Sequence, residues 1–134
     1  MPSFKVLIVE DDTMISSMYK IRLEQEGHIV AIADNGSQGL EVAFREKPDL
    51  ILLDVMMPQM DGFTLLQELR LQDSFRKTPI IMLTNLGTIE DREKGKKFGA
   101  TDYLVKANLT PTEVSEVVAK YAKGDVEKKN ILEN

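Results

Sequence analysis

The chain has 134 residues, of which 43% are hydrophobic and 29% charged, and its formal net charge is −5 at neutral pH. Length and composition are typical of one globular domain. The absence of cysteine excludes disulfides and thiolate metal sites, and a single histidine excludes a multi-histidine metal centre. The acidic balance argues against broad nucleic-acid binding, which needs a basic surface. No apolar run approaches the roughly 20 residues of a membrane span, and without cysteine we expect a cytoplasmic protein.

The first strand and helix are predicted near the N-terminus. Lys5–Val9 is a short apolar run typical of a buried strand. Asp12 or Thr13 is expected to cap a helix that continues to about Glu26 and stops at Gly27. The residues at helical spacing within it are Met14, Ile15, Met18, Ile21 and Arg22.

The middle of the chain predicts two further strands around a helix. Ile29–Ala33 is a shorter strand, and Asn35-Gly36 is either a turn or the start of the next helix. The helix Gln38–Glu46 ends before Pro48. Its inward residues are expected to be Leu40, Ala43 and Phe44. The run Leu50–Asp54 is almost wholly apolar, which predicts a central strand covered on both faces.

Two helices and a strand are predicted next. Phe63–Arg70 is a helix whose inward residues are Leu65, Leu66 and Leu69. Pro79–Thr84 is a strand. The helix Ile89–Phe98 has few apolar residues, and the glycine within it, Gly95, costs about 1 kcal/mol relative to alanine. Such an element has low local stability.

The last strand and helix complete an alternating pattern. Tyr103–Val105 is a strand, and Thr110-Pro111-Thr112-Glu113 is a strong helix start. One face of that helix carries Val114, Val117, Val118 and Tyr121, and Lys123-Gly124 ends it. Strands that alternate with helices predict an α/β fold with a doubly wound parallel sheet. We expect one domain over residues 1–124 and a short polar tail over 125–134.

Four of the predicted strands end in a polar residue or are followed by one: Glu10-Asp11-Asp12, Asp54, Thr84 and Lys106. The carboxyl ends of parallel strands meet at one edge of the sheet, where open α/β folds place their sites. Converging carboxylates suit a hard cation such as Mg²⁺, although three adjacent acids can also be a solvated loop. Asp54 is either a loop cap or a nucleophile that forms an acyl phosphate.

The joint spacing of four motifs resembles the response-regulator receiver domain, the phospho-acceptor of two-component signalling, over about residues 4–123. The motifs are Val6-Leu7-Ile8-Val9-Glu10-Asp11-Asp12, Leu53-Asp54-Val55-Met56-Met57-Pro58-Gln59-Met60-Asp61-Gly62, Ile81-Met82-Leu83-Thr84 and Gly99-Ala100-Thr101-Asp102-Tyr103-Leu104-Val105-Lys106. The resemblance implies a flavodoxin-like, five-stranded sheet with strand order 2-1-3-4-5.

The resemblance also implies a role for each site residue. Asp54 is the phosphorylation site, and it receives the phosphoryl group from a sensor histidine kinase or a phosphotransfer protein. The implied Mg²⁺ site consists of Glu10, Asp11, Asp54 and the backbone carbonyl of Met56, with Asp11 as the direct ligand alongside Asp54. Lys106 pairs with Asp54 at rest. The implied switch residues are Thr84 and Tyr103. The alternative for Tyr103 is an aromatic strand residue that only packs against a neighbouring helix.

Three departures from the family pattern concern four positions. Ala107 stands where the family usually has proline after the lysine, so we expect either a cis Lys106–Ala107 bond or another loop path, and favour cis. Asn85 replaces a small residue that normally admits the phosphoryl group. Met56 and Leu86 are apolar neighbours of the phosphoryl site that cannot orient a hydrolytic water, which predicts slow self-dephosphorylation.

The preferred interpretation is a stand-alone receiver, a phosphorylation-controlled binding module and not an enzyme. Its output surface is the helix 89–98, the strand 103–105 and the helix that starts at Pro111, and it is a monomer or a weak dimer on phosphorylation. The first alternative is a fragment of a larger regulator with a DNA-binding or enzymatic domain. A phosphatase is disfavoured because Met56 replaces its second aspartate, and the intact Asp11, Asp54, Thr84 and Lys106 argue against a degenerate receiver.

Overall fold

Within the described residues of the computed structural model, which are 3–57, 60–84, 88–106 and 109–122, five parallel strands form one sheet. The strands are β1 (Lys5–Val9), β2 (Ile29–Ala33), β3 (Leu50–Asp54), β4 (Ile80–Thr84) and β5 (Asp102–Val105). Their order across the sheet is β2-β1-β3-β4-β5. The predicted doubly wound sheet and its strand order are therefore confirmed.

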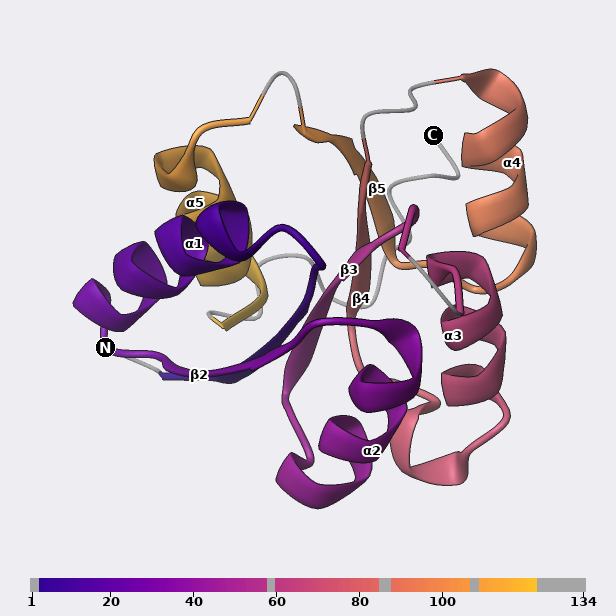
Figure 1. The fold of residues 1–134 in the computed structure, drawn as a ribbon, viewed down its shortest axis with the longest axis horizontal. Coiled ribbons are helices and arrows are strands. Elements are labelled where there is room, and N and C mark those ends of the chain that lie inside the picture. Colours follow the sequence, from indigo (N-terminus) through magenta and orange to yellow (C-terminus); the bar gives the residue numbers. More distant parts are fainter. Residues whose placement is uncertain (1–2, 58–59, 85–87, 107–108, 123–134) are drawn as a thin grey trace.

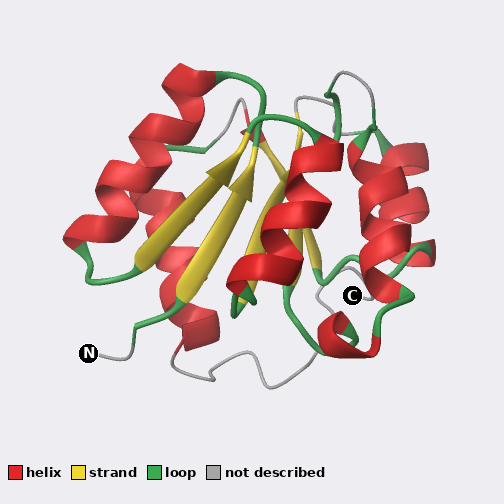
Figure 2. Ribbon diagram, turned by 60° about the horizontal axis from the view of Figure 1, so that its bottom comes forward, coloured by secondary structure: helices red, strands yellow, loops and turns green. Residues whose placement is uncertain are grey.

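Helices cover both faces of this sheet, as Figures 1 and 2 show. On one face lie α1 (Thr13–Gln25) and α5 (Pro111–Ala122). On the other lie α2 (Gly36–Glu46), α3 (Gly62–Arg70) and α4 (Ile89–Lys97). Sequence analysis missed a short 3₁₀ turn, Asp73–Phe75, which buries Phe75 between α3 and β4.

The sheet divides the hydrophobic core into two clusters, because successive side chains of a strand point to opposite faces. Val6 and Ile8 of β1 pack with α1 and α5, whereas Leu7 and Val9 pack with α2 and α3. Every residue of β3 is buried. The prediction of a central strand covered on both faces is thus confirmed.

The apolar stripe suggested for α1 is not its buried face. Met14, Met18 and Ile21 are 77%, 47% and 59% exposed. The buried side chains of this helix are Ser16, Tyr19 and Leu23. Tyr19 and Leu23 belong to the core cluster on this face of the sheet, so the number of apolar residues on a face of the helix did not predict which face is buried.

The face predicted for α2 is also partly wrong. Ala43 is buried, but Leu40 is half-buried and Phe44 is 44% exposed, with its ring against that of Phe75 at 5.6 Å between centroids. The helix begins at Gly36 because the Asn35 side chain accepts a hydrogen bond from the Gln38 amide. Asn35-Gly36 is therefore a helix start rather than a free turn.

Several predictions fall on residues outside the described ranges: the tail 125–134, the Lys106–Ala107 bond, Asn85 and Leu86.

The predicted start of α5 is confirmed, since Thr110 and Glu113 exchange side-chain-to-backbone hydrogen bonds of 3.1 and 3.2 Å. No helix in the described part of the chain has the length and apolar character needed to cross a membrane.

Gly62 holds the start of α3 against the end of β3. A Cβ atom at this position would lie 2.2 Å from the Asp54 carbonyl oxygen, which is backbone and cannot rotate away. We expect Gly62→Ala to lower the free energy of unfolding by about 2 kcal/mol. Chemical denaturation measures this change. Gly95→Ala is the control, since its Cβ would meet only side-chain atoms, and an equal loss in both variants would contradict the account.

Candidate functional site

The polar residues that follow the strands gather at one edge of the sheet. Leu53 of β3 is in register with Val9 of β1, so Asp54, the last residue of β3, is level with Glu10, which follows β1. Asp54 is in register with Leu83, which places Thr84 one residue further along β4. Thr84 is in register with Val105, so Lys106 follows directly. The predicted convergence of the strand ends is what the topology produces.

Lys106 joins two of the carboxylates. Its Nζ atom forms an ion pair with Glu10 Oε1 and lies 3.5 Å from Asp54 Oδ1. All three side chains are at most 8% exposed. The predicted pairing with Asp54 is present, but Glu10 is the nearer partner, which sequence analysis did not foresee.

Burial and charge shift the acid–base equilibria of this group. Burial and the neighbouring Glu10 carboxylate raise the pKa of Asp54 to about 7, against the attraction of Lys106 and the Met56 amide. Burial alone lowers the pKa of Lys106, but its contacts with Glu10 and Asp54 outweigh this and the pKa is raised. Lys106 is therefore a permanent cation beside a carboxylate that retains its proton more strongly than usual.

The three consecutive acids have different environments. Asp12 Oδ1 caps α1 by accepting hydrogen bonds from the amides of Met14 and Ile15 at 3.0 and 3.2 Å. Glu10 is buried, and its Oε2 accepts a hydrogen bond from the Asp12 amide at 3.1 Å. Asp11 is exposed. The triplet is thus neither a uniform solvated loop nor three equivalent metal ligands.

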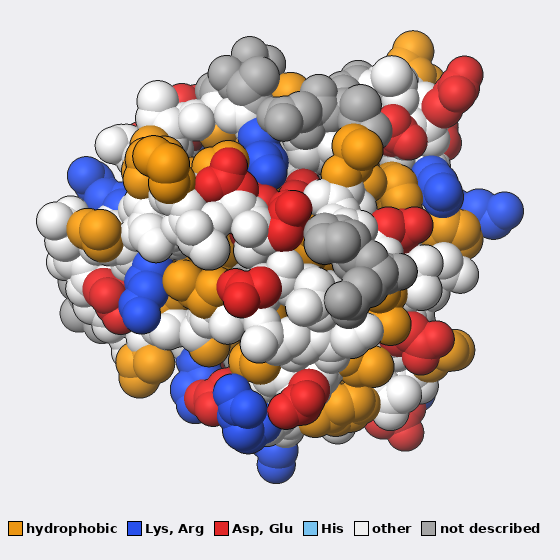
Figure 3. Space-filling view, in the orientation of Figure 1, with side chains coloured by type: hydrophobic (Ala, Val, Ile, Leu, Met, Phe, Trp, Pro, Cys, Tyr) orange, Lys and Arg blue, Asp and Glu red, His pale blue; other side chains and the backbone are white. Residues whose placement is uncertain are grey.

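The carboxylates of Glu10, Asp11 and Asp54 each offer an oxygen atom, and these atoms lie within 4.8 Å of one another. Figure 3 shows acidic side chains gathered near the middle of this face of the molecule. An all-oxygen donor set with one exposed carboxylate fits Mg²⁺, which usually keeps several waters. Lys106 and the Asp12 amide already contact the Glu10 carboxylate.

Thr84 and Tyr103 form the second polar feature of the site. Both residues are 1% exposed. Burial raises the pKa of Tyr103, and the neighbouring Thr84 hydroxyl partly offsets the increase. The ring packs under α4, where a Cβ on Gly95 would lie 3.1 Å from it, and the Arg92 guanidinium lies 5.6 Å from its centroid. Tyr103 therefore connects the strand-end site with α4.

The α4 helix packs thinly against the rest of the protein. Gly95 is its only buried residue among those described. A further contact is made by Lys94 Nζ, which lies 4.6 Å from the centroid of the Phe63 ring. A helix with so little buried apolar area has low local stability, as its sequence predicts.

Sequence analysis missed Tyr19. It is 4% exposed on α1, and burial raises its pKa, while the charge of Lys106 opposes the increase. Its hydroxyl is thus within electrostatic reach of Lys106. The i, i+3, i+7 spacing of Ser16, Tyr19 and Leu23 is the signal that could have found it.

Comparison with known proteins gives a consistent result. The family model for the response regulator receiver domain matches residues 6–119. A relative from Synechocystis, the DNA-binding dual master transcriptional regulator RpaA, is 42% identical over 87% of this chain and 46% of its own length. The YkoG transcriptional regulatory protein of Bacillus subtilis is 41% identical over 86% of this chain and 48% of its own. The chain spans about half the length of these relatives.

One similar solved structure is that of Vibrio cholerae chemotaxis protein CheY4. Its sequence is 35% identical, its TM-score is 0.82, and the match covers 87% of this chain and 96% of that chain.

Proposed function

This chain belongs to the response regulator receiver domain family, and from that membership we propose that it accepts a phosphoryl group on Asp54 from a sensor histidine kinase or a phosphotransfer protein. The observation that carries the proposal is the placement of Asp54, whose buried carboxylate lies 3.5 Å from the ammonium of Lys106 and clusters with the carboxylates of Glu10 and Asp11. A buried carboxylate beside an ammonium group and a candidate metal-binding site is suited to nucleophilic attack on phosphorus.

Each residue of the site has its own role in phosphoryl transfer. An oxygen of Asp54 forms a bond to phosphorus as the bond between phosphorus and the donor breaks. Lys106 is within reach of the phosphoryl oxygens because it already lies 3.5 Å from Asp54 Oδ1. The amide of Met56, which lies 3.4 Å from the same oxygen, orients the carboxylate. Fixed donors of this kind stabilise developing charge without reorganisation.

A bound Mg²⁺ would supply positive charge beside Asp54, in addition to that of Lys106. We propose that Asp11 and Asp54 hold it directly, with Glu10 in support through its contact with Lys106. The proposed contribution of the Met56 carbonyl completes the set named from the sequence.

The response to phosphorylation passes, in this proposal, from Thr84 to Tyr103 and then to α4. The Thr84 hydroxyl lies close enough to Tyr103 to affect the pKa of its hydroxyl, and a phosphoryl group on Asp54 would offer Thr84 another hydrogen-bond acceptor. A change of partner alters the packing of Tyr103 under Gly95. The α4–β5–α5 surface is then the proposed docking site for an output partner, in a monomer or a weak dimer.

A second form of the proposal is that the receiver works within a larger regulator. The curated relatives named above are transcriptional regulators about twice as long as this chain, which favours a DNA-binding output over an enzymatic one. The same switch surface then acts on a covalently attached domain. Phosphoryl acceptance on Asp54 is common to both forms.

Asp11→Asn tests the metal site within this proposal. We expect at least an approximately tenfold loss of Mg²⁺ affinity in calorimetric titration, with a matching loss of phosphoryl uptake from acetyl phosphate. Asp12→Asn is the matched control, because asparagine caps a helix as well as aspartate does. Equal losses in both variants would show that net charge, rather than a ligand set, governs the response.

A further inference from the structure

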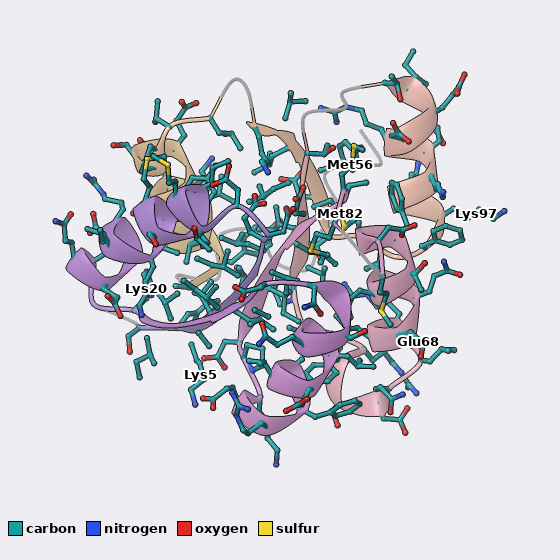
Figure 4. The ribbon with its side chains drawn as sticks, in the orientation of Figure 1. Lys5, Lys20, Met56, Glu68, Met82 and Lys97 are labelled. Atoms are coloured by element: carbon teal, nitrogen blue, oxygen red, sulfur yellow. The ribbon has the colours of Figure 1, made fainter. Side chains whose placement is uncertain are left out.

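Met56 carries an exposed thioether two residues after the acceptor Asp54. It is 63% exposed, and its backbone amide lies 3.4 Å from Asp54 Oδ1. In Figure 4 its side chain lies beyond the end of β3, whereas Met82 lies within the body of the sheet. Met82 is fully buried. An oxidant from solvent can therefore reach the sulfur at Met56 but not the one at Met82.

The other described methionines provide internal references. Met14 and Met18 are 77% and 47% exposed on α1, and neither contacts Asp54 in any recorded hydrogen bond of the described chain. Met57 and Met60 are half-buried and pack against the core. Among the described residues, only Met56 is both exposed and hydrogen-bonded to the acceptor.

Oxidation changes the chemistry of this side chain. A peroxide transfers one oxygen atom to the thioether sulfur, which becomes a sulfoxide, and the peroxide is reduced to water or an alcohol. The product is a polar hydrogen-bond acceptor on a chain of nearly the same length. An acceptor next to the acyl phosphate can hold and orient a water molecule, which the apolar thioether cannot do.

We propose that Met56 is an oxidation site through which peroxides shorten the lifetime of the phosphoryl group on Asp54. This inference rests on the proposed phosphoryl acceptance and adds a redox input to it. The modification leaves the fold intact, because the exposed Met56 side chain belongs to neither core cluster. Reduction of the sulfoxide by methionine sulfoxide reductases restores the longer lifetime.

The test treats the whole chain with hydrogen peroxide and measures sulfoxide at each methionine by peptide mass spectrometry. The protein is then phosphorylated with acetyl phosphate and Mg²⁺, the donor is removed, and the decay of the phosphorylated mass is followed. We expect Met56 to oxidise at a rate similar to Met14 and well ahead of Met82. We also expect decay to accelerate about 2- to 10-fold, the effect of one hydrogen bond, and to recover after reductase treatment.

Two variants separate Met56 from the other exposed methionines. Met56→Leu, compared with itself before and after peroxide, is expected to show no change in decay. The Met14→Leu/Met18→Leu double variant is expected to keep the full response. The proposal is overturned if Met56 resists oxidation, if its oxidation leaves decay unchanged, or if Met56→Leu responds as the wild type does. Failure of the reduced wild type to take up a phosphoryl group would instead overturn the proposed function, and this inference with it.

Discussion

Lys106→Met is expected to lower the free energy of unfolding of the metal-free protein by about 3 kcal/mol at pH 8. The side chain is 8% exposed and contacts two buried carboxylates. Removal of one partner from a buried ion pair leaves an uncompensated charge, which is more costly than loss of the pair as a whole. Denaturant titration with and without Mg²⁺ measures the effect, and the cation should recover part of the loss.

Two further variants make this result specific. Lys96→Met removes an exposed lysine from α4 and should change stability by less than about 0.5 kcal/mol. Glu10→Gln in the Lys106→Met background should restore part of the stability, since it removes the carboxylate nearest to the missing ammonium. If the double variant is no more stable than Lys106→Met, the ion pair is not the source of the loss.

Asp54→Asn is expected to stabilise the metal-free protein at high pH. The pKa of Asp54 is raised to about 7 in the folded state from an ordinary value of 3.8. Between these values the folded state retains a proton that the unfolded state has released, so stability falls as pH rises through this window. At pH 8 both states are ionised and the folded state carries the full penalty, which asparagine removes.

The expected gain is about 2 kcal/mol at pH 8 and near zero at pH 4. A pKa shift of this size corresponds to a change of at most about 4 kcal/mol in the free energy of unfolding. Solvent near the exposed Asp11 reduces this contribution. Denaturation at a series of pH values in the presence of a chelator measures the gain, and saturating Mg²⁺ should abolish it. A pH-independent gain would contradict the explanation, because it would arise from packing rather than charge.

The sequence predicted the strands and the edge where they meet because both depend on local signals. Short apolar runs such as Leu50–Asp54 define the buried strands, and parallel connectivity then places Asp54, Thr84 and Lys106 together. The helix caps at Asn35 and Thr110 were also predictable, since each is formed by residues a few positions apart in the sequence.

Other features depend on tertiary contacts that the sequence does not encode locally. The buried face of α1 consists of Ser16, Tyr19 and Leu23, whereas the exposed Met14 and Met18 suggested a different face. The ion pair between Lys106 and Glu10 joins residues 96 positions apart. The burial of Tyr103 under Gly95 likewise depends on how α4 packs.

Intact-mass measurement after incubation with Mg²⁺ and acetyl phosphate tests the central claim most directly. We expect the wild type and the nearby cap variant Asp61→Asn to gain one phosphoryl group each, since asparagine can also cap α3. Asp54→Asn should gain none, and fragmentation of the wild type should place the group on Asp54. No gain in the wild type, or an equal gain in Asp54→Asn, would contradict the assignment of Asp54 as the acceptor.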